Sequence, residues 1–177
     1  ANTKIKIKHL LNHTSGYGYQ FLNPEIKFLV DQKILQDIQD DGEDFLDAPI
    51  LFEPGTRWNY GISTDLLGYI IEKLTYKKLD EYMKENLFNQ LGMKNTTFSL
   101  DKNKYNNLAY IYDYIDNNIT INKRIAKYQD EGVGRSFHSG GGGLTSTTQD
   151  YAKFMRLFLS NDNSVISENS INLMKSN

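Results

Sequence analysis

The sequence predicts an α+β fold that is predominantly helical, with a few short antiparallel strands. Several segments place apolar residues three and four positions apart, which is the spacing of one helix face. Two other stretches, 96–100 and 108–125, are instead rich in β-branched and aromatic residues, which favour strands. A chain of 177 residues, 39% of them hydrophobic, is long enough for one ordinary domain. We therefore expect a single domain over residues 1–177.

The predicted helices lie mainly in the first half of the chain. Gly16 and Gly92 follow two of them, and glycine readily adopts the left-handed backbone that ends a helix. Pro24 suits a first helical turn, and Ser63 or Thr64 can cap the helix that begins there. The predicted helical segments are residues 7–11, 24–38, a short segment around Phe45, 63–74 and 79–91.

The second half combines strand and loop patterns before two final helices. Asp116-Asn117-Asn118 divides the second strand-like stretch and predicts a hairpin turn. The run Gly140–Gly143 predicts a loop, and Thr147, with Asp150 three residues on, predicts the cap of a following helix. A last helix is expected over Ser167–Asn177.

Charge and composition argue against several classes of partner. The 20 basic and 22 acidic residues are dispersed, and the net charge of −2 offers no basic surface for nucleic acid or anionic membranes. No apolar run approaches the ~20 residues of a membrane-spanning helix. The absence of cysteine excludes disulfides, thiolate metal sites and cysteine nucleophiles. No pattern predicts a cofactor or a metal ion.

The segment Pro54–Ser63 is the strongest candidate for chemistry. Proline presets one turn dihedral and glycine tolerates positive φ, so Pro54 and Gly55 predict a rigid bend shortly before Tyr60. A helix start follows the tyrosine, which can hold its hydroxyl firmly. A phenol, with a reference pKa of ~10, acts as a base or proton shuttle only where a nearby cation stabilises the phenolate. Tyr60 therefore requires a lysine partner and a nucleophile.

Four sequence blocks occur in an order that resembles a known family. The blocks are KIKHLLNHTSG at 6–16, PGTRWNY at 54–60, LGMKNTTF at 91–98 and GGGGLTST at 140–147. Together they resemble the penicillin-recognising serine hydrolases, namely class C β-lactamases, DD-peptidases and related esterases, over essentially the whole chain. The resemblance implies a serine β-lactamase-like fold, an antiparallel sheet flanked by helices. This chain would be its helical region.

The resemblance also implies how the catalytic residues are divided. This family carries an upstream Ser-x-x-Lys, a central Tyr-x-Asn and a downstream Lys-Thr-Gly or His-x-Gly strand. Tyr60 takes the tyrosine role, whereas Ile62 occupies the asparagine position, which is similar to the esterase-like branch and argues against amide-recognising β-lactamase activity. The nucleophile and the final strands are expected outside residues 1–177, which makes the chain an internal fragment. The substrate cleft is expected to include Gly140, Gly141, Gly142 and Gly143 in its wall.

Two motif-like groups imitate the missing catalytic elements. Ser99-Leu100-Asp101-Lys102 is a literal Ser-x-x-Lys, but it follows a strand-like segment, and the family places its nucleophile upstream of the first block. His138-Ser139-Gly140 likewise imitates His-x-Gly inside the glycine block. We interpret both as coincidences.

Other groups have alternative interpretations. His9 and His13 lie four apart, as zinc ligands do, with His138 as a conceivable third, but the glutamate of the zinc motif is absent. The glycines could cradle a phosphate, although no lysine accompanies them. Arg57 and Trp58 could contact substrate, or the arginine could lie on the tryptophan as a fold anchor.

Two functions fit these patterns. In the first, the parent protein is a serine hydrolase that acts through an acyl-enzyme on a small-molecule ester, amide or peptide. The isolated piece would then be inactive, because it lacks the nucleophile. In the second, the chain belongs to a non-catalytic relative and serves as a binding or assembly module. An intact upstream Ser-x-x-Lys would favour the first.

Overall fold

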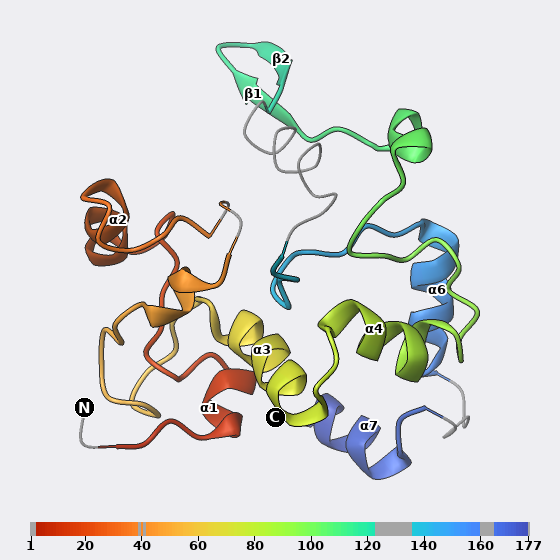
Figure 1. Ribbon diagram of the computed structural model, residues 1–177, viewed down its shortest axis with the longest axis horizontal. Coiled ribbons are helices and arrows are strands. Elements are labelled where there is room, and N and C mark those ends of the chain that lie inside the picture. The colour runs from red at the N-terminus through yellow and green to blue at the C-terminus, as the bar shows by residue number, and fades with distance from the viewer. Residues whose placement is uncertain (1–2, 39, 41, 123–135, 160–164, 177) are drawn as a thin grey trace.

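The computed structural model describes residues 3–38, 40, 42–122, 136–159 and 165–176. Within these residues helices predominate, and the strands form one two-stranded antiparallel sheet, as the sequence predicts (Figure 1). No helix in the described ranges combines the length and apolar character that crossing a lipid bilayer requires. The helices are α1 (Ile7–Leu11), α2 (Pro24–Asp31), α3 (Ser63–Thr75), α4 (Leu79–Met83), α6 (Thr148–Arg156) and α7 (Glu168–Lys175), with 3₁₀ segments η1 (Asp44–Asp47) and η3 (Lys102–Asn107) and a π-helical turn η2 (Lys84–Phe88).

The helix predicted for residues 24–38 is shorter than expected, so its predicted length was wrong. It ends at Asp31, and Lys33 adopts a left-handed conformation with φ of 55°. The next two backbone N–H groups both donate to the carbonyl of Leu29, at 2.9 and 3.2 Å, which closes the helix. Leu35 nevertheless packs against the core from an irregular segment. The apolar residues after Asp31 therefore indicate packing against the core and not a longer helix.

Helix α3 begins where predicted, but the predicted cap by Ser63 or Thr64 was wrong. Ile62 is the N-cap residue, and no side chain caps that end. The Ser63 hydroxyl instead lies 2.8 Å from that of Ser15, and both side chains are fully buried. Ser63 therefore ties α3 to the loop that follows α1.

The predicted hairpin is confirmed and its turn lies where expected. β1 (Tyr112–Ile115) and β2 (Asn118–Ile121) pair in antiparallel register, from Tyr112 with Ile121 to Ile115 with Asn118. Asp116 and Asn117 have φ of 50° and 62°, the left-handed pair that two-residue hairpins favour. The hairpin projects from one end of the molecule (Figure 1). Residues 123–125 of the predicted strand region lie outside the described residues.

The strand predicted for residues 96–100 was wrong. Thr97 makes only an isolated antiparallel bridge with Thr145, with N–H···O distances of 2.9 and 2.8 Å. The neighbouring residues do not extend this pairing, and Phe98 and Ser99 lie in a bend. The helix predicted for 79–91 is present as α4 followed by η2.

The last two helices begin with side-chain caps. The Thr147 hydroxyl accepts a hydrogen bond from the Asp150 N–H at 3.2 Å, which confirms the predicted cap of α6. The Ser167 hydroxyl accepts one from the Ser170 N–H at 3.2 Å at the start of α7. Each cap satisfies an N–H group that has no partner within its own helix.

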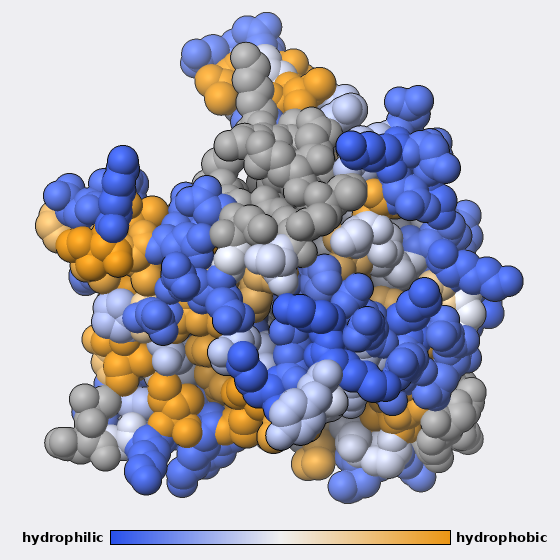
Figure 2. Space-filling view, viewed as in Figure 1, coloured by the Kyte–Doolittle hydropathy of each residue, from blue (hydrophilic) through white to orange (hydrophobic). Residues whose placement is uncertain are grey.

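The core places the start of α3 beside the loop that follows α1. Its central cluster comprises Tyr19, Ile26, Phe45, Ala48 and Ile62. Figure 2 shows apolar side chains gathered on the side of α1 and α2, and mainly hydrophilic ones over α4 and α6. Ile62, the N-cap residue of α3, belongs to this cluster, so the end of the segment before α3 is anchored in the core.

Candidate active site

Tyr60 lies in a connection that backbone contacts hold in place. Gly55 turns the chain with φ of 88°, and its N–H donates to the carbonyl of Thr14 at 2.7 Å. The Asn59 N–H donates to the carbonyl of His13 at 2.9 Å. The rigid bend predicted before Tyr60 is therefore present, and it is anchored to the loop after α1.

Gly61 fixes the position of Tyr60 from the other side. A Cβ atom at Gly61 would lie 2.4 Å from the carbonyl oxygen of Tyr17, so only glycine fits there. The Asn59 side-chain amide donates to the same carbonyl at 2.8 Å. Tyr60 thus sits between two residues that are both held against one loop.

The Tyr60 ring belongs to an aromatic cluster at the surface. Its centroid lies 4.9 Å from that of His13, 5.2 Å from Tyr19 and 6.4 Å from Trp58. Tyr60 keeps 38% of its surface exposed, and no described residue hydrogen-bonds to its hydroxyl. Burial lowers the pKa of His13 below 6.5, so this imidazole is neutral at pH 7. Packing orients the Tyr60 ring and leaves the hydroxyl available.

The four residues Gly140–Gly143, here called the glycine run, pack against the start of α3. A Cβ atom at Gly140 would lie 2.4 Å from the carbonyl oxygen of Thr64, and one at Gly141 would lie 2.7 Å from Asp65 Oδ2. At Gly142, in contrast, a Cβ atom would meet nothing within 4 Å. The glycines at 140 and 141 are therefore required for close approach to α3.

Asp65 joins the glycine run to the aromatic cluster around Tyr60. The side chain is fully buried, and its Oδ1 accepts hydrogen bonds from the Ser139 hydroxyl and, at 3.1 Å, from the Gly141 N–H. Oδ2 accepts from the Tyr19 hydroxyl at 2.8 Å. Burial raises the pKa of Tyr19, and the charge of Asp65 raises it further, so the phenol stays protonated and donates. The Asp65 carboxylate thus links the glycine run to Tyr19, whose ring contacts that of Tyr60.

Sequence reasoning did not single out Tyr19 or Asp65. The available signal was the pair Asp65 and Gly68, an acid and a glycine three apart on one face of an apolar helix. Gly68 also meets the glycine run, since its Cα would lie 3.4 Å from a Cβ atom on Gly140. Tyr19 carried no signal, because its partner lies 46 residues away in the sequence.

The glycine run also lines an apolar cavity of about 410 Å³. The wall across from the glycines consists of side chains from α3, α4 and the segment after them: Leu67, Ile71, Leu79, Met83 and Phe98. Tyr60 is not among the residues that line this cavity. The glycine run therefore contacts Asp65 on one side and the cavity on the other, and its role in substrate binding stays a prediction.

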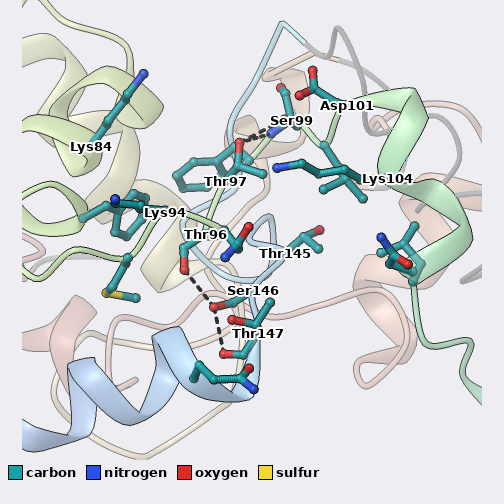
Figure 3. Close-up of a pocket in the computed structure, with 18 of the residues that line it drawn as sticks. Lys84, Lys94, Thr96, Thr97, Ser99, Asp101, Lys104, Thr145, Ser146 and Thr147 are labelled. Atoms are coloured by element: carbon teal, nitrogen blue, oxygen red, sulfur yellow. Dashed lines mark hydrogen bonds between the residues drawn. The ribbon is translucent and has the colours of Figure 1, made fainter.

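A larger and more polar cavity, of about 850 Å³, lies between η2, the segment 96–108 and the start of α6 (Figure 3). Thr96 and Ser146 point toward one another in it, with their hydroxyl oxygens 2.8 Å apart. Lys84, Lys94 and Lys104 contribute to its wall. Neither Tyr60 nor the glycine run lines this cavity, so it is separate from the candidate site.

The motif around Ser99 lacks the geometry of a nucleophile. Ser99 is exposed and lies in a bend, and η3 begins only at Lys102, so the two side chains do not share a helical turn. The Ser99 N–H donates to the Thr97 hydroxyl at 3.1 Å. These contacts agree with the interpretation of this motif as a coincidence.

The remaining candidate groups do not assemble as a site. α1 ends at Leu11 and His13 has φ of 55°, so the expectation that His9 and His13 share a helix face was wrong. Within the described residues, no group of three or more histidine or acidic side chains is placed to hold a metal ion. Arg57 lies over the ring of Phe52 at 4.3 Å, and the suggested stacking on Trp58 was wrong.

Comparison with known proteins gives one consistent family. The Beta-lactamase family model matches residues 1–177. Monacolin J acid methylbutanoyltransferase of Aspergillus terreus is 31% identical over 175 residues, which cover 97% of this chain and 42% of the relative. Lovastatin esterase of Penicillium rubens is 29% identical, over 96% of this chain and 43% of the relative. The chain thus spans about two fifths of the length of these curated relatives.

Solved structures agree on the fold. The unliganded simvastatin synthase of Aspergillus terreus is similar with a TM-score of 0.82 and 29% identity, over 98% of this chain and 43% of that chain. The octameric penicillin-binding protein homologue from Pyrococcus abyssi has a TM-score of 0.69 at 24% identity, over 97% of this chain and 38% of that chain.

Proposed function

The chain belongs to the Beta-lactamase family, and from that premise we propose that it is the central, mainly helical part of a longer enzyme that transfers acyl groups through an acyl-enzyme. The proposal places the serine nucleophile and its lysine in a segment outside residues 1–177. Its support is the curated relatives, which include an acyltransferase and an esterase and are more than twice as long as this chain. The isolated 177 residues would then be inactive.

One observation carries the catalytic part of the proposal. Tyr60 stands at the tyrosine position of the family pattern, its ring is oriented by three aromatic neighbours, and its hydroxyl is free of described hydrogen-bond partners. That arrangement suits a group that must exchange a proton with an incoming serine or a departing alcohol. In the proposed step, the serine oxygen bonds to the acyl carbon, the ester C–O bond breaks, and the proton released by the serine hydroxyl passes by way of Tyr60 to the oxygen of the leaving alcohol.

The residue two positions after Tyr60 favours esters over amides. Ile62 keeps only 3% of its surface exposed and belongs to the central core cluster. It therefore offers no polar group to a substrate amide at the place where the β-lactamase pattern has asparagine. We propose a small-molecule ester as the acyl donor, and water or an alcohol as the acceptor.

The test is acylation of the full-length protein that contains this chain. With a fluorescent activated ester, we expect covalent labelling of the wild type, and labelling about 10²- to 10⁴-fold slower in Tyr60→Phe, the usual contribution of a positioned acid or base. Tyr76→Phe is the matched control, because Tyr76 is 95% exposed at the end of α3 and should label at the wild-type rate.

Two results would contradict the proposal. A folded wild-type protein that neither an activated ester nor a β-lactam labels would support the alternative of a non-catalytic binding or assembly module. Labelling of the isolated 177 residues at Ser99 would show that the nucleophile lies inside this chain.

A further inference from the structure

We propose that Asp65 is a positioning residue for this site, which joins the glycine run to the aromatic cluster around Tyr60 at the start of α3. The catalytic part of this inference rests on the proposed acyl transfer. The structural part rests on three hydrogen bonds that converge on one fully buried carboxylate.

The three donors come from segments that are distant in sequence. Tyr19 lies 46 residues before Asp65, and Ser139 and Gly141 lie 74 and 76 residues after it. Burying a carboxylate costs free energy that an apolar contact between the same segments would avoid. Hydrogen bonds, however, fix direction as well as distance, which apolar packing does not. The polar contact therefore specifies the geometry of the site.

The loop side of this contact is organised around one hydroxyl. Ser139 Oγ donates to Asp65 and accepts from the N–H groups of Gly141 and Gly142, at 3.2 and 3.1 Å. Because a hydroxyl has one proton, its donation to Asp65 leaves its lone pairs for the two amides. Asp65 thus sets the orientation of Ser139, and Ser139 sets the path of the glycine run.

The other side leads to Tyr60. The Tyr19 hydroxyl donates to Asp65 Oδ2 at 2.8 Å, and the Tyr19 ring lies edge-on to that of Tyr60, with centroids 5.2 Å apart. Tyr19 also stacks on Phe21 at 4.8 Å, so its ring is held from two sides. A shift of the Asp65 carboxylate would therefore move the support of Tyr60 and the glycine run relative to each other.

The main variant is Asp65→Asn in the full-length protein. The amide has the shape of the carboxylate but replaces one acceptor by a donor, so at least one side of the contact must rearrange. We expect kcat/KM for the activated ester to fall about 10- to 100-fold, the scale of a misplacement near 1 Å. Single variants on the two sides of the contact should have different kinetic effects. Tyr19→Phe is expected to lower kcat with KM nearly constant, and Ser139→Ala to raise KM with kcat nearly constant.

The matched control is Asp150→Asn. Asp150 is also buried, at 1% exposure, and also accepts several hydrogen bonds, but its contacts lie at the start of α6, away from Tyr60. The substitution should lower thermal stability and leave kcat and KM unchanged at temperatures where the protein is folded. Equal kinetic constants for the Asp65→Asn and Asp150→Asn proteins, after correction for folded fraction, would overturn the proposal.

Hydrogen exchange gives a readout that does not depend on catalysis. Asp65→Asn should speed amide exchange in the segment 139–144 several-fold more than Asp150→Asn does. If the wild-type protein is not acylated, the proposed function fails, and this measurement alone decides the role of Asp65. Unchanged exchange in 139–144 would show that Asp65 does not hold the loop.

Discussion

Two buried aspartates join distant parts of this chain, and they are stabilised in different ways. Asp150 accepts hydrogen bonds from the Lys153 ammonium group at 2.8 Å and from the Asn95 N–H at 2.6 Å. Asp65 accepts only neutral donors among the described residues, namely a phenol, an alcohol and a backbone amide. Asp150 has a cation from its own helix among its donors, in addition to the more distant Asn95. Asp65 has only neutral donors, so its stabilisation depends on how the segments that carry Tyr19, Ser139 and Gly141 place those donors.

The largest expected effect tests the close approach of the glycine run to α3. Gly140→Ala would place a methyl group 2.4 Å from the Thr64 carbonyl oxygen, and overpacking of this kind costs about 1–3 kcal/mol or more. Gly142→Ala meets open space and should change stability by less than about 0.5 kcal/mol. Denaturant unfolding of the two variants measures the difference. A loss for Gly140→Ala as small as that for Gly142→Ala would show that the loop moves aside freely from α3.

The second expected effect concerns Asp150 in acid. Burial would raise the pKa of Asp150, but the bonds from Lys153, Asn95 and Thr96 outweigh it and lower the pKa below 3.8. A lowered folded-state pKa stabilises the protein above the unfolded-state pKa, and this stability is lost as the pH falls through the folded-state value. Asp150→Asn should therefore cost about 1–3 kcal/mol at pH 7 and less below about pH 4.

Thermal unfolding of the wild type and Asp150→Asn between pH 7 and pH 2 checks this sign. A stability difference that stays constant down to pH 2 would show that the charge of Asp150 contributes nothing.

The smallest expected effect concerns Tyr19 in base. Its folded-state pKa is raised, first by burial and then by Asp65, so its contribution is present below an unfolded-state pKa of about 10 and is lost as the pH rises further. Tyr19→Phe should cost about 1 kcal/mol at pH 7, the usual value of one hydrogen bond. That cost should shrink above pH 10 and stay constant in acid, the reverse of Asp150→Asn. Chemical unfolding at pH 7 and pH 10.5 distinguishes the two.

The local parts of the fold were predictable from the sequence. The turn at Asp116 and Asn117, the Thr147 cap and the bend before Tyr60 each depend on residues within a few positions of one another. The length of α2 was not predictable, because the apolar residues after Asp31 keep helical spacing while they pack from an irregular segment.

Only two parts of the candidate site, Tyr60 and the glycine run, could be predicted from the sequence. Tyr60 and the glycine run belong to sequence blocks, whereas the carboxylate between them receives bonds from residues 46 to 76 positions away. Ser63 shows the same limit, since its local pattern suggested a helix cap and its actual partner is Ser15. Contacts of this range follow from tertiary packing, and no short window of sequence contains both partners.

The glycine run has one open position among closed ones, and this bears on how such a site can evolve. At Gly140, Gly141 and Gly143 an added methyl group would meet atoms within 3 Å, whereas at Gly142 it would meet none within 4 Å. Gly142 is therefore the position of this loop at which a substitution can add a side chain without disturbing the fold. Successive substitutions at this position could change the wall of the apolar cavity and leave the contact between the glycine run and α3 intact.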